Sequence, residues 1–361
     1  MPPVTITNHT PARGFKAGLT LVELLIVVVI SLIISGVAFA LYRSNTGYYL
    51  REEAYIQQQQ NLRAAFYIMS RDLRMAGNGL RVLGPNVNLL NAWTPSRLAV
   101  DNGNFKIDIV PGWFSYPDST ENGIRAIFGI DGGDNQPDAI TVFRAEVEYP
   151  APLGLVKEIG SEFIDLDAAV KTDTVAAGDI IALVNENNAV ILEVNSVSSN
   201  RITIVNNGRF TGPSGPPSTF PNLGSTVYNL RNVNLVTYYI DQINNRLMAA
   251  HHDPQYTGYD DPASKSVVVA NNIEDLQIQY FFGSDEVDPD ALEHTPDIST
   301  ARLKNDKVKA LGLAMTSRSG YGEGSTTRLR PALYNRLEGT TPDNRRRSTL
   351  SEFIYLRNYS K

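Results

Sequence analysis

The chain has 361 residues, of which 42% are hydrophobic and 19% are charged, a composition typical of a globular protein. It contains no cysteine, which excludes disulfides, thiolate metal sites and cysteine nucleophiles, and its net charge of −6 argues against general nucleic-acid binding. Its 27 Gly and 20 Pro residues, together with many Tyr and Phe residues, favour a turn-rich β protein.

A membrane-spanning helix is predicted close to the N-terminus. Residues 24–41 read LLIVVVISLIISGVAFAL, an 18-residue run without charge or Pro that is long enough to span a bilayer. A secretory signal peptide would have a shorter apolar core and a small-residue cleavage site, and a buried core helix would have a polar face. Because Arg13 and Lys16 precede the run without any acid, we expect a cytoplasmic N-terminus and an external head.

A single carboxylate, Glu23, stands at the start of this apolar run. An acid at this depth is costly unless it has a partner or a role. The simpler interpretation is that Glu23 lies in the membrane interface, where it favours the positive end of the helix dipole.

The segment Gly18-Leu19-Thr20-Leu21-Val22-Glu23 resembles the cleavage site of the type IV prepilin family. In that family a short basic leader ends in Gly and is followed by a residue that is usually Phe, then Thr, Leu, any residue and Glu. Gly18 matches the residue before the cut, Leu19 the new N-terminus and Glu23 the fifth mature residue. A cut after Gly14 would leave no acid at the fifth position.

The resemblance implies how the chain is processed and which partners it has. Prepilin peptidase would cleave between Gly18 and Leu19 and methylate the amine of Leu19. The mature chain would be a single-pass inner-membrane protein with a periplasmic head, and would reach the pilus on the cell surface after assembly. Its partners would be other minor and major pilins and the inner-membrane assembly platform, and Glu23 would pair with the N-terminal amine of a neighbouring subunit.

The helix is expected to continue from the membrane span into the head, over residues 19–76. Apolar residues recur three or four positions apart between residues 62 and 76, and Gly77-Asn78-Gly79 provides a C-cap. Gly36 and Gly47 are candidate bending points, although close helix packing explains Gly36 equally well. The sequence therefore predicts an α+β fold, in which a long helix packs on a large, mainly antiparallel β head over residues 77–361.

Beyond residue 80 the pattern is that of β-strands. Residues 211–224 either divide the head into two β lobes or form one long loop, and residues 285–299 form a second loop. The expected strands cover residues 139–143, 180–184, 190–194, 202–205, 235–240, 266–270, 276–282 and 310–316.

Several segments of the head are similar to PilW-like minor pilins. This similarity implies a low-copy subunit that helps to start or cap the pilus. A pseudopilin of a type II secretion system shares the same stem, and an adhesin or ligand-binding head on a pilin stem is a further alternative. The similar segments are residues 70–77, 137–142, 273–280, 345–347 and 356–358.

Other polar clusters give weaker predictions. Asp131, Asp134 and Asp138 could bind calcium, but a solvated acidic turn is favoured. A metal site at residues 251–253, His-His-Asp, is disfavoured because adjacent residues of a strand point to opposite faces. The Arg run at residues 345–347 could touch DNA, but a solvated strand end explains it better. We expect no cofactor and no enzymatic activity, because the chain has no known nucleophile motif.

Overall fold

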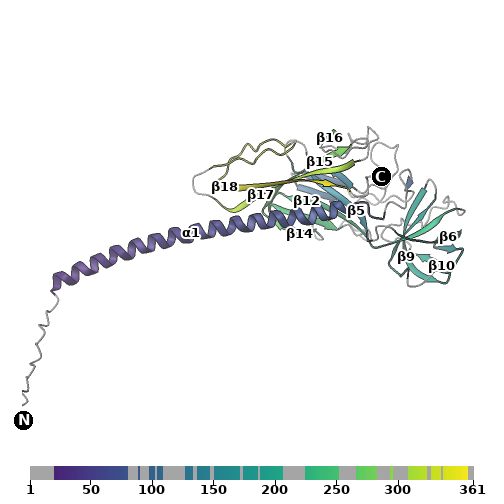
Figure 1. Ribbon diagram of the computed structural model, residues 1–361, viewed down its shortest axis with the longest axis horizontal. Coiled ribbons are helices and arrows are strands. Elements are labelled where there is room, and N and C mark those ends of the chain that lie inside the picture. Colours follow the sequence, from purple (N-terminus) through teal and green to yellow (C-terminus); the bar gives the residue numbers. More distant parts are fainter. Residues whose placement is uncertain are drawn as a thin grey trace, which may run out of the picture. The chain divides into compact units, whose positions relative to one another are not determined.

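The computed structural model contains a long helix followed by a large region of mostly antiparallel β-sheet (Figure 1). This arrangement confirms the α+β fold class that was expected from the sequence. The structure describes residues 20–79, 88–89, 97–101, 104–108, 127–132, 136–146, 150–170, 174–185, 188–205, 224–251, 266–282, 293–295, 308–322, 327–334 and 336–356.

Helix α1 spans Leu21–Arg74, two residues shorter at each end than the sequence predicted. Thr20 precedes its first turn, and a turn over residues 75–79 follows its last. In this turn Gly77 and Gly79 have positive φ angles of 78° and 79°, a conformation in which a side chain would be strained. The Gly77 N–H donates to the Phe143 carbonyl at 2.8 Å, so the cap also fixes the helix end to the sheet.

Two antiparallel sheets pack against the second part of this helix. The first has the strand order β14-β13-β12-β5-β4, and the second has the order β16-β15-β17-β18. Their strands are β4 (Ile127–Ile130), β5 (Ala139–Ala145), β12 (Val233–Asp241), β13 (Arg246–His251), β14 (Ser266–Asn271), β15 (Ile273–Phe282), β16 (Glu293–Thr295), β17 (Val308–Gly322) and β18 (Arg345–Tyr355).

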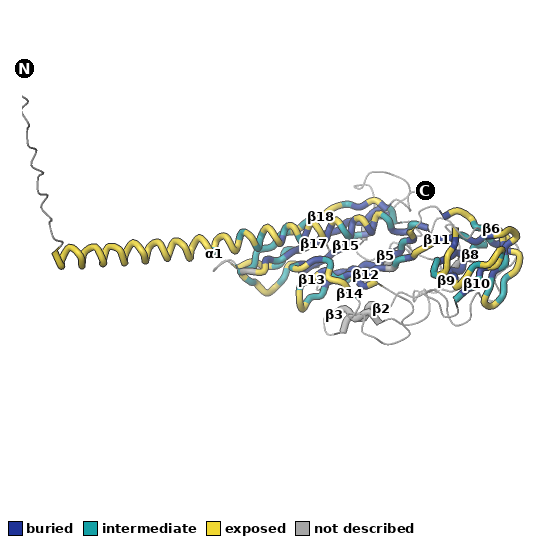
Figure 2. The backbone as a smooth tube through the Cα atoms, turned by 90° about the horizontal axis from the view of Figure 1, so that it is seen from below, coloured by how far each residue is buried: buried dark blue, intermediate teal, exposed yellow. Residues whose placement is uncertain are grey.

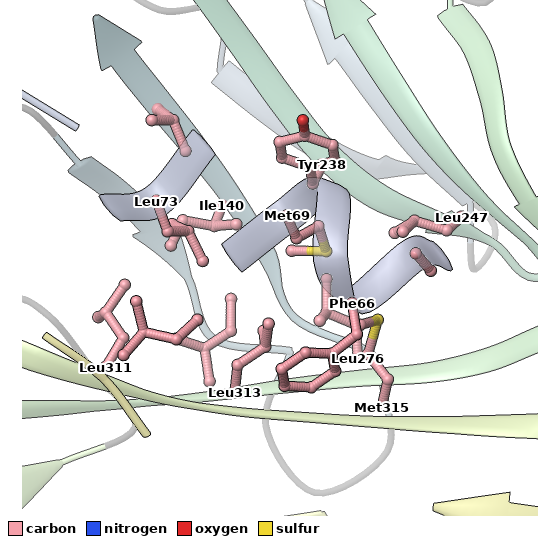
Figure 3. Packing of buried hydrophobic residues seen from close by; sticks show 14 of the residues in the cluster. Phe66, Met69, Leu73, Ile140, Tyr238, Leu247, Leu276, Leu311, Leu313 and Met315 are labelled. Carbon is pink, nitrogen blue, oxygen red and sulfur yellow. The ribbon is translucent and has the colours of Figure 1, made fainter. Parts of the chain in front are cut away.

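The main hydrophobic core lies where the helix and these two sheets meet. Figure 3 shows the helix segment carrying Phe66, Met69 and Leu73 between strands of the two sheets. Tyr238 of the first sheet and Leu313 of the second belong to the same cluster of buried residues. Burial of these apolar side chains is the main force that holds the helix on the head.

A third set of strands closes into a barrel with its own core. Strands β8, β9, β10, β7, β6 and β11 pair in that order, and β11 pairs with β8 to close the ring. Strand β1 (Asn88–Leu89) adds a parallel pairing to β9. The other strands are β6 (Pro152–Ile159), β7 (Phe163–Leu166), β8 (Ile180–Val184), β9 (Asn188–Ser198), β10 (Arg201–Ile204) and β11 (Thr226–Arg231).

The barrel is inserted between two neighbouring strands of the first sheet. Ala145 at the end of β5 pairs with Val233 at the start of β12, and the chain between them forms the barrel. Most of the candidate break at residues 211–224 lies outside the described residues. The strands on either side of it, β10 and β11, both belong to the barrel.

Every strand expected from the sequence overlaps a strand of the structure. Strands without a clear apolar pattern were missed, among them β6. The strand end expected at residues 345–347 is the start of β18, whose remaining residues were not predicted. Strands β2 (Arg97–Asp101) and β3 (Asn104–Asp108) form a separate hairpin. Most of the loop expected at residues 285–299 lies outside the described residues.

Candidate assembly site

The start of helix α1 is closed by a reciprocal cap between Thr20 and Glu23. The Thr20 backbone N–H and hydroxyl donate to Glu23 Oε2 at 2.9 and 3.0 Å, and the Glu23 N–H lies 3.3 Å from Thr20 Oγ1. Each residue thus satisfies a backbone donor at the helix N-terminus, as in a capping box. Sequence reasoning placed Glu23 at the helix dipole but missed Thr20 as its partner, although the Thr-x-x-Glu spacing was a usable signal.

Gly18 and Leu19, the residues on either side of the expected cut, lie outside the described part of the chain. Thr20 and Glu23 both follow the expected cut, so the cap uses only residues that a processed chain would retain. Both hydrogen bonds from Thr20 to the Glu23 carboxylate use Oε2.

The helix that follows this cap exposes a large apolar surface. The Leu, Ile and Val side chains between Leu21 and Leu41 are roughly half to three-quarters exposed. The helix is long and apolar enough to cross a membrane, and Figure 2 colours this part of it as exposed. A surface of this kind is unfavourable in water, which indicates that lipid or other apolar helices cover it.

The two stem glycines do not interrupt the helix. Gly36 and Gly47 both lie inside α1, and a Cβ atom added at either would meet no atom within 4 Å. The prediction that they bend the helix, or that Gly36 allows close packing of a neighbour, stays a prediction.

The other end of the helix is fixed to the first sheet by a buried carboxylate. Tyr238 donates its hydroxyl to Asp72 Oδ2 at 2.7 Å, and Arg144 lies 3.1 Å from Asp72 Oδ1. Burial and the bond to Asp72 raise the pKa of the Tyr238 hydroxyl above its ordinary range. Asp72 lies in the last turn of α1, so its contacts give this end of the helix a structural role.

Two further contacts join the middle of the helix to the second sheet. The buried Gln58 side chain donates to the backbone carbonyl and the hydroxyl of Ser317 at 2.9 and 3.0 Å. The Arg346 guanidinium lies over the ring of Tyr55, 3.7 Å from its centroid. These contacts begin the part of the helix that belongs with the head.

The candidate calcium ligands have different environments. Asp138 is buried, and its two carboxylate oxygens accept the backbone N–H groups of Gly132 at 2.9 Å and Ile278 at 2.7 Å. Asp131 is exposed, and Asp134 lies outside the described residues. Asp138 therefore connects the start of β5 to β15, and its oxygens are engaged with the backbone.

Burial raises the pKa of Asp138 to about 8, although its two backbone hydrogen bonds lower it. The negative charges of Asp131 and Asp275 raise this pKa further. A buried carboxyl group with such a pKa makes the stability of the head depend on pH.

The Arg run at residues 345–347 makes contacts within the head. Arg345 donates to the carbonyls of Ser319 and Gly320, and Arg347 pairs with Glu274 at 2.7 Å and with Asp343 at 2.8 Å. These contacts favour a structural role for the run over contact with DNA.

For the candidate metal site at residues 251–253, the first His is exposed at the end of β13 and the other two residues are outside the described part.

The same region contains a buried ion-pair cluster that the sequence did not indicate. Asp275 is fully buried and pairs with Arg330, at 3.0 Å, and with Arg336. These arginines lie 55 and 61 residues away along the chain, so no local pattern could have linked them. The cluster holds Arg330 and Arg336 against β15.

The N-terminal segment of the chain is similar to a known protein family. Residues 13–39 match a family model described as the prokaryotic N-terminal methylation motif. Among solved structures, the chain is similar to a type IV-like pilin from Thermus thermophilus, with 14% identity and a TM-score of 0.22 over 51% of this chain and 86% of that chain. None of the curated proteins matches. The chain carries the N-terminal methylation motif of type IV prepilins.

Proposed function

We propose that this protein is a low-copy structural subunit of a type IV pilus that helps to start or cap the filament. The observation that carries this proposal is the methylation motif at residues 13–39, which includes most of the exposed apolar part of α1. Prepilin peptidase would cleave after Gly18 and methylate Leu19. The stem would then move from lipid into a bundle of similar stems, with little change in the apolar surface exposed to water.

Glu23 is the proposed docking residue of this stem. In an apolar bundle an unpaired carboxylate costs several kcal/mol, and the methylated amine of a neighbouring subunit is the nearest cation of the required kind. The cap supports this role, because both bonds from Thr20 use Oε2 and, among the described residues, no hydrogen bond to Glu23 Oε1 occurs. An incoming amine could therefore bind Oε1 while the cap stays closed.

The size of the head supports a position at the filament tip. Residues 77–361 follow the helix, and they include a barrel between β5 and β12 whose described residues do not belong to the core around α1. A repeating subunit would have to fit this bulk between its neighbours along the whole filament, whereas a subunit at the tip has no subunit packed above it.

The test makes the same Glu-to-Gln substitution at two positions of α1, residues 23 and 53, in cells that make pili. We expect Glu23→Gln to leave the amount of protein in the membrane unchanged but to lower its amount in sheared pili. A Gln at this position still completes the cap, so the loss would report on the missing charge. Glu53→Gln, also on α1 and exposed, is the matched control and should assemble normally.

Three outcomes would contradict parts of this proposal. An intact leader on the assembled protein would show that processing after Gly18 does not occur. If the chain were the most abundant subunit in purified pili, the low-copy role would be wrong. If its deletion left pili intact but stopped the export of secreted proteins, the chain would be a pseudopilin of a type II secretion system.

A second function, ligand binding by the head, is favoured by the inserted barrel. Because Ala145 and Val233 are paired neighbours, residues 147–231 can be replaced by a short Gly-containing turn without stretching the first sheet. If the barrel binds a surface or ligand, this deletion should abolish adhesion while pili still assemble. Unchanged adhesion would exclude a binding role for the barrel.

A further inference from the structure

Strand β14 is an outer strand of the first sheet, and it pairs with β13 on one side only. In an antiparallel sheet, every second residue of such a strand directs its N–H and C=O groups away from its neighbour. Among the described residues, residues 267–270 of β14 have no main-chain hydrogen bond besides their pairing with β13. Helix α1 reaches only the end of the strand, where Asn61 Nδ2 donates to the Asn271 carbonyl at 3.4 Å.

The composition of β14 differs from that of the other outer strands in the two sheets that pack on α1. Strands β4 and β16 have only four and three residues, and β18 carries three Arg and one Glu. Short length and charge are devices that stop an open sheet edge from pairing with other chains. Strand β14 reads SVVVAN, without charge or Pro, and Val267 and Val268 are 57% and 39% exposed.

The unpaired main-chain groups define what kind of element can cover this edge. A helix bonds its own main-chain groups internally, whereas an extended strand presents the alternating donors and acceptors that an open edge requires. The two exposed valines favour a strand that is uncharged and rich in β-branched residues. Val269 is skipped in the pairing with β13, so residues 266–268 are the regular stretch for a partner strand.

The orientation of the molecule argues against a second copy as the source of this strand. Two identical edges that pair antiparallel are related by a two-fold axis perpendicular to the sheet. Such an axis reverses every direction in the sheet plane, including that of the helix segment packed on the sheet, which contains Phe66 and Met69. Copies that enter one membrane by the same N-terminal span point the same way, so this self-pairing does not suit them.

We propose that the outer edge of β14 pairs with an extended, uncharged strand of a different pilus subunit, so that the first sheet continues from one subunit into the next. This inference rests on the proposed function, because it needs an assembly in which two different subunits lie side by side. The contact belongs to the head, and it is separate from the docking of the stem through Glu23.

Cysteine cross-linking in the full-length protein tests this pairing, because the chain has no Cys of its own. Val268→Cys places a thiol on β14, and Ile243→Cys places one on an exposed turn of the same sheet as the matched control. Each variant is labelled in pilus-producing cells with a short thiol-reactive photo-cross-linker. We expect Val268→Cys, but not Ile243→Cys, to form an adduct with another pilin-type subunit, and mass spectrometry should locate the linked site in an uncharged, extended segment.

Substitutions at Val267 then test the chemistry of the edge. In the Val268→Cys background, Val267→Lys should lower the adduct yield roughly fivefold, because Lys on an outer strand opposes pairing. Val267→Thr keeps an uncharged, β-branched residue and should keep most of the yield. Ile243→Lys is the control for charge elsewhere on the sheet and should have no effect. Equal yields from the Lys and Thr variants would overturn the role of the edge.

Hydrogen exchange tests the main-chain pairing itself. We expect residues 266–270 to exchange roughly tenfold more slowly in assembled pili than in the detergent-solubilised protein, with little change in the turn at residues 242–245. Docking through side chains alone would give adducts without this protection, so unchanged exchange would overturn strand pairing. An adduct of twice the chain's own mass, or one linked to a helix or a charged segment, would overturn the assignment of the partner.

Co-purification from the same cells separates this inference from the proposed function. If other pilins co-purify with the protein but Val268→Cys gives no adduct, the assignment of β14 fails and the proposed function stands. If no pilin co-purifies and no adduct forms, both fail.

Discussion

The two parts of helix α1 have the same secondary structure but opposite surroundings. From residue 21 to residue 53 almost every side chain is exposed, although most of those up to Leu41 are apolar. From residue 54 onward, one face is buried against two sheets and contains Phe66, Met69 and Leu73. The division falls at Glu53 and Ala54, where the chain also separates into two compact units.

The comparison shows that what apolar residues do in a helix depends on their spacing. In the stem they are continuous around the helix, so no single face can be buried against one head and all sides must be covered by lipid or other helices. In the second part they repeat every three or four residues, so one face enters a core and the opposite face stays free.

The largest expected loss of stability comes from removing a core side chain from the second part of α1, which begins at residue 54. Phe66→Ala should lower the free energy of unfolding of a chain that begins at Ala54 by about 3–5 kcal/mol. Phe66 is 3% exposed, whereas its neighbour Tyr67 is 69% exposed. Tyr67→Ala should therefore change stability by less than about 1 kcal/mol in the same denaturant titration. Equal losses would contradict the one-sided burial.

The buried carboxylate at the helix end should have the next largest effect. Asp72→Asn leaves Arg144 and Tyr238 without their charged partner and should cost about 3 kcal/mol in the same titration. Arg74→Gln breaks an ion pair whose two partners are about half exposed, and should cost less than about 1 kcal/mol. A small effect of Asp72→Asn would show that apolar packing alone holds the helix end.

The Asp138 carboxyl group, which connects the start of β5 to β15, should make the stability of the head depend on pH. The pKa of Asp138 is about 8 in the folded chain and near its ordinary value of ~3.9 when unfolded, so between these values the folded chain binds more protons. Stability should therefore fall as the pH rises from about 4 to about 8, by on the order of 1–3 kcal/mol. Denaturant titrations at several pH values should show a flatter profile for Asp138→Asn. An identical slope in the variant would assign the pH dependence to other groups.

The smallest expected effect lies at the start of the stem. Thr20→Ala removes the hydroxyl of the cap and should destabilise the first turn of α1 by about 1 kcal/mol. Hydrogen exchange of the detergent-solubilised protein should be faster at residues 21–24 and unchanged in the head. Faster exchange throughout the stem would mean that the cap controls more than its own turn.

The sequence predicted the elements that rest on local patterns. The long helix follows from a continuous and then periodic apolar pattern, and strands such as β5 and β8 follow from short apolar runs. Strand β6 was missed because it starts with Pro152 and has no regular apolar pattern. Only the start of β18 was expected, as a strand end at residues 345–347, because charged and polar residues dominate the strand. Their pairing with neighbouring strands outweighs their weak local preference.

At the candidate assembly site, the sequence by itself determined the motif from Gly18 to Glu23 and the apolar stem, because both are contiguous in the chain. Only the tertiary structure decided that Asp72 meets Tyr238 and Arg144, that Asp138 bonds to β15, and that a barrel is inserted between β5 and β12. These features join residues that are far apart in the chain. The contacts of Asp72 and Asp138 form because buried polar groups must find partners in the packed core, wherever in the sequence those partners lie. The barrel is an insertion because β5 and β12 pair with each other across it.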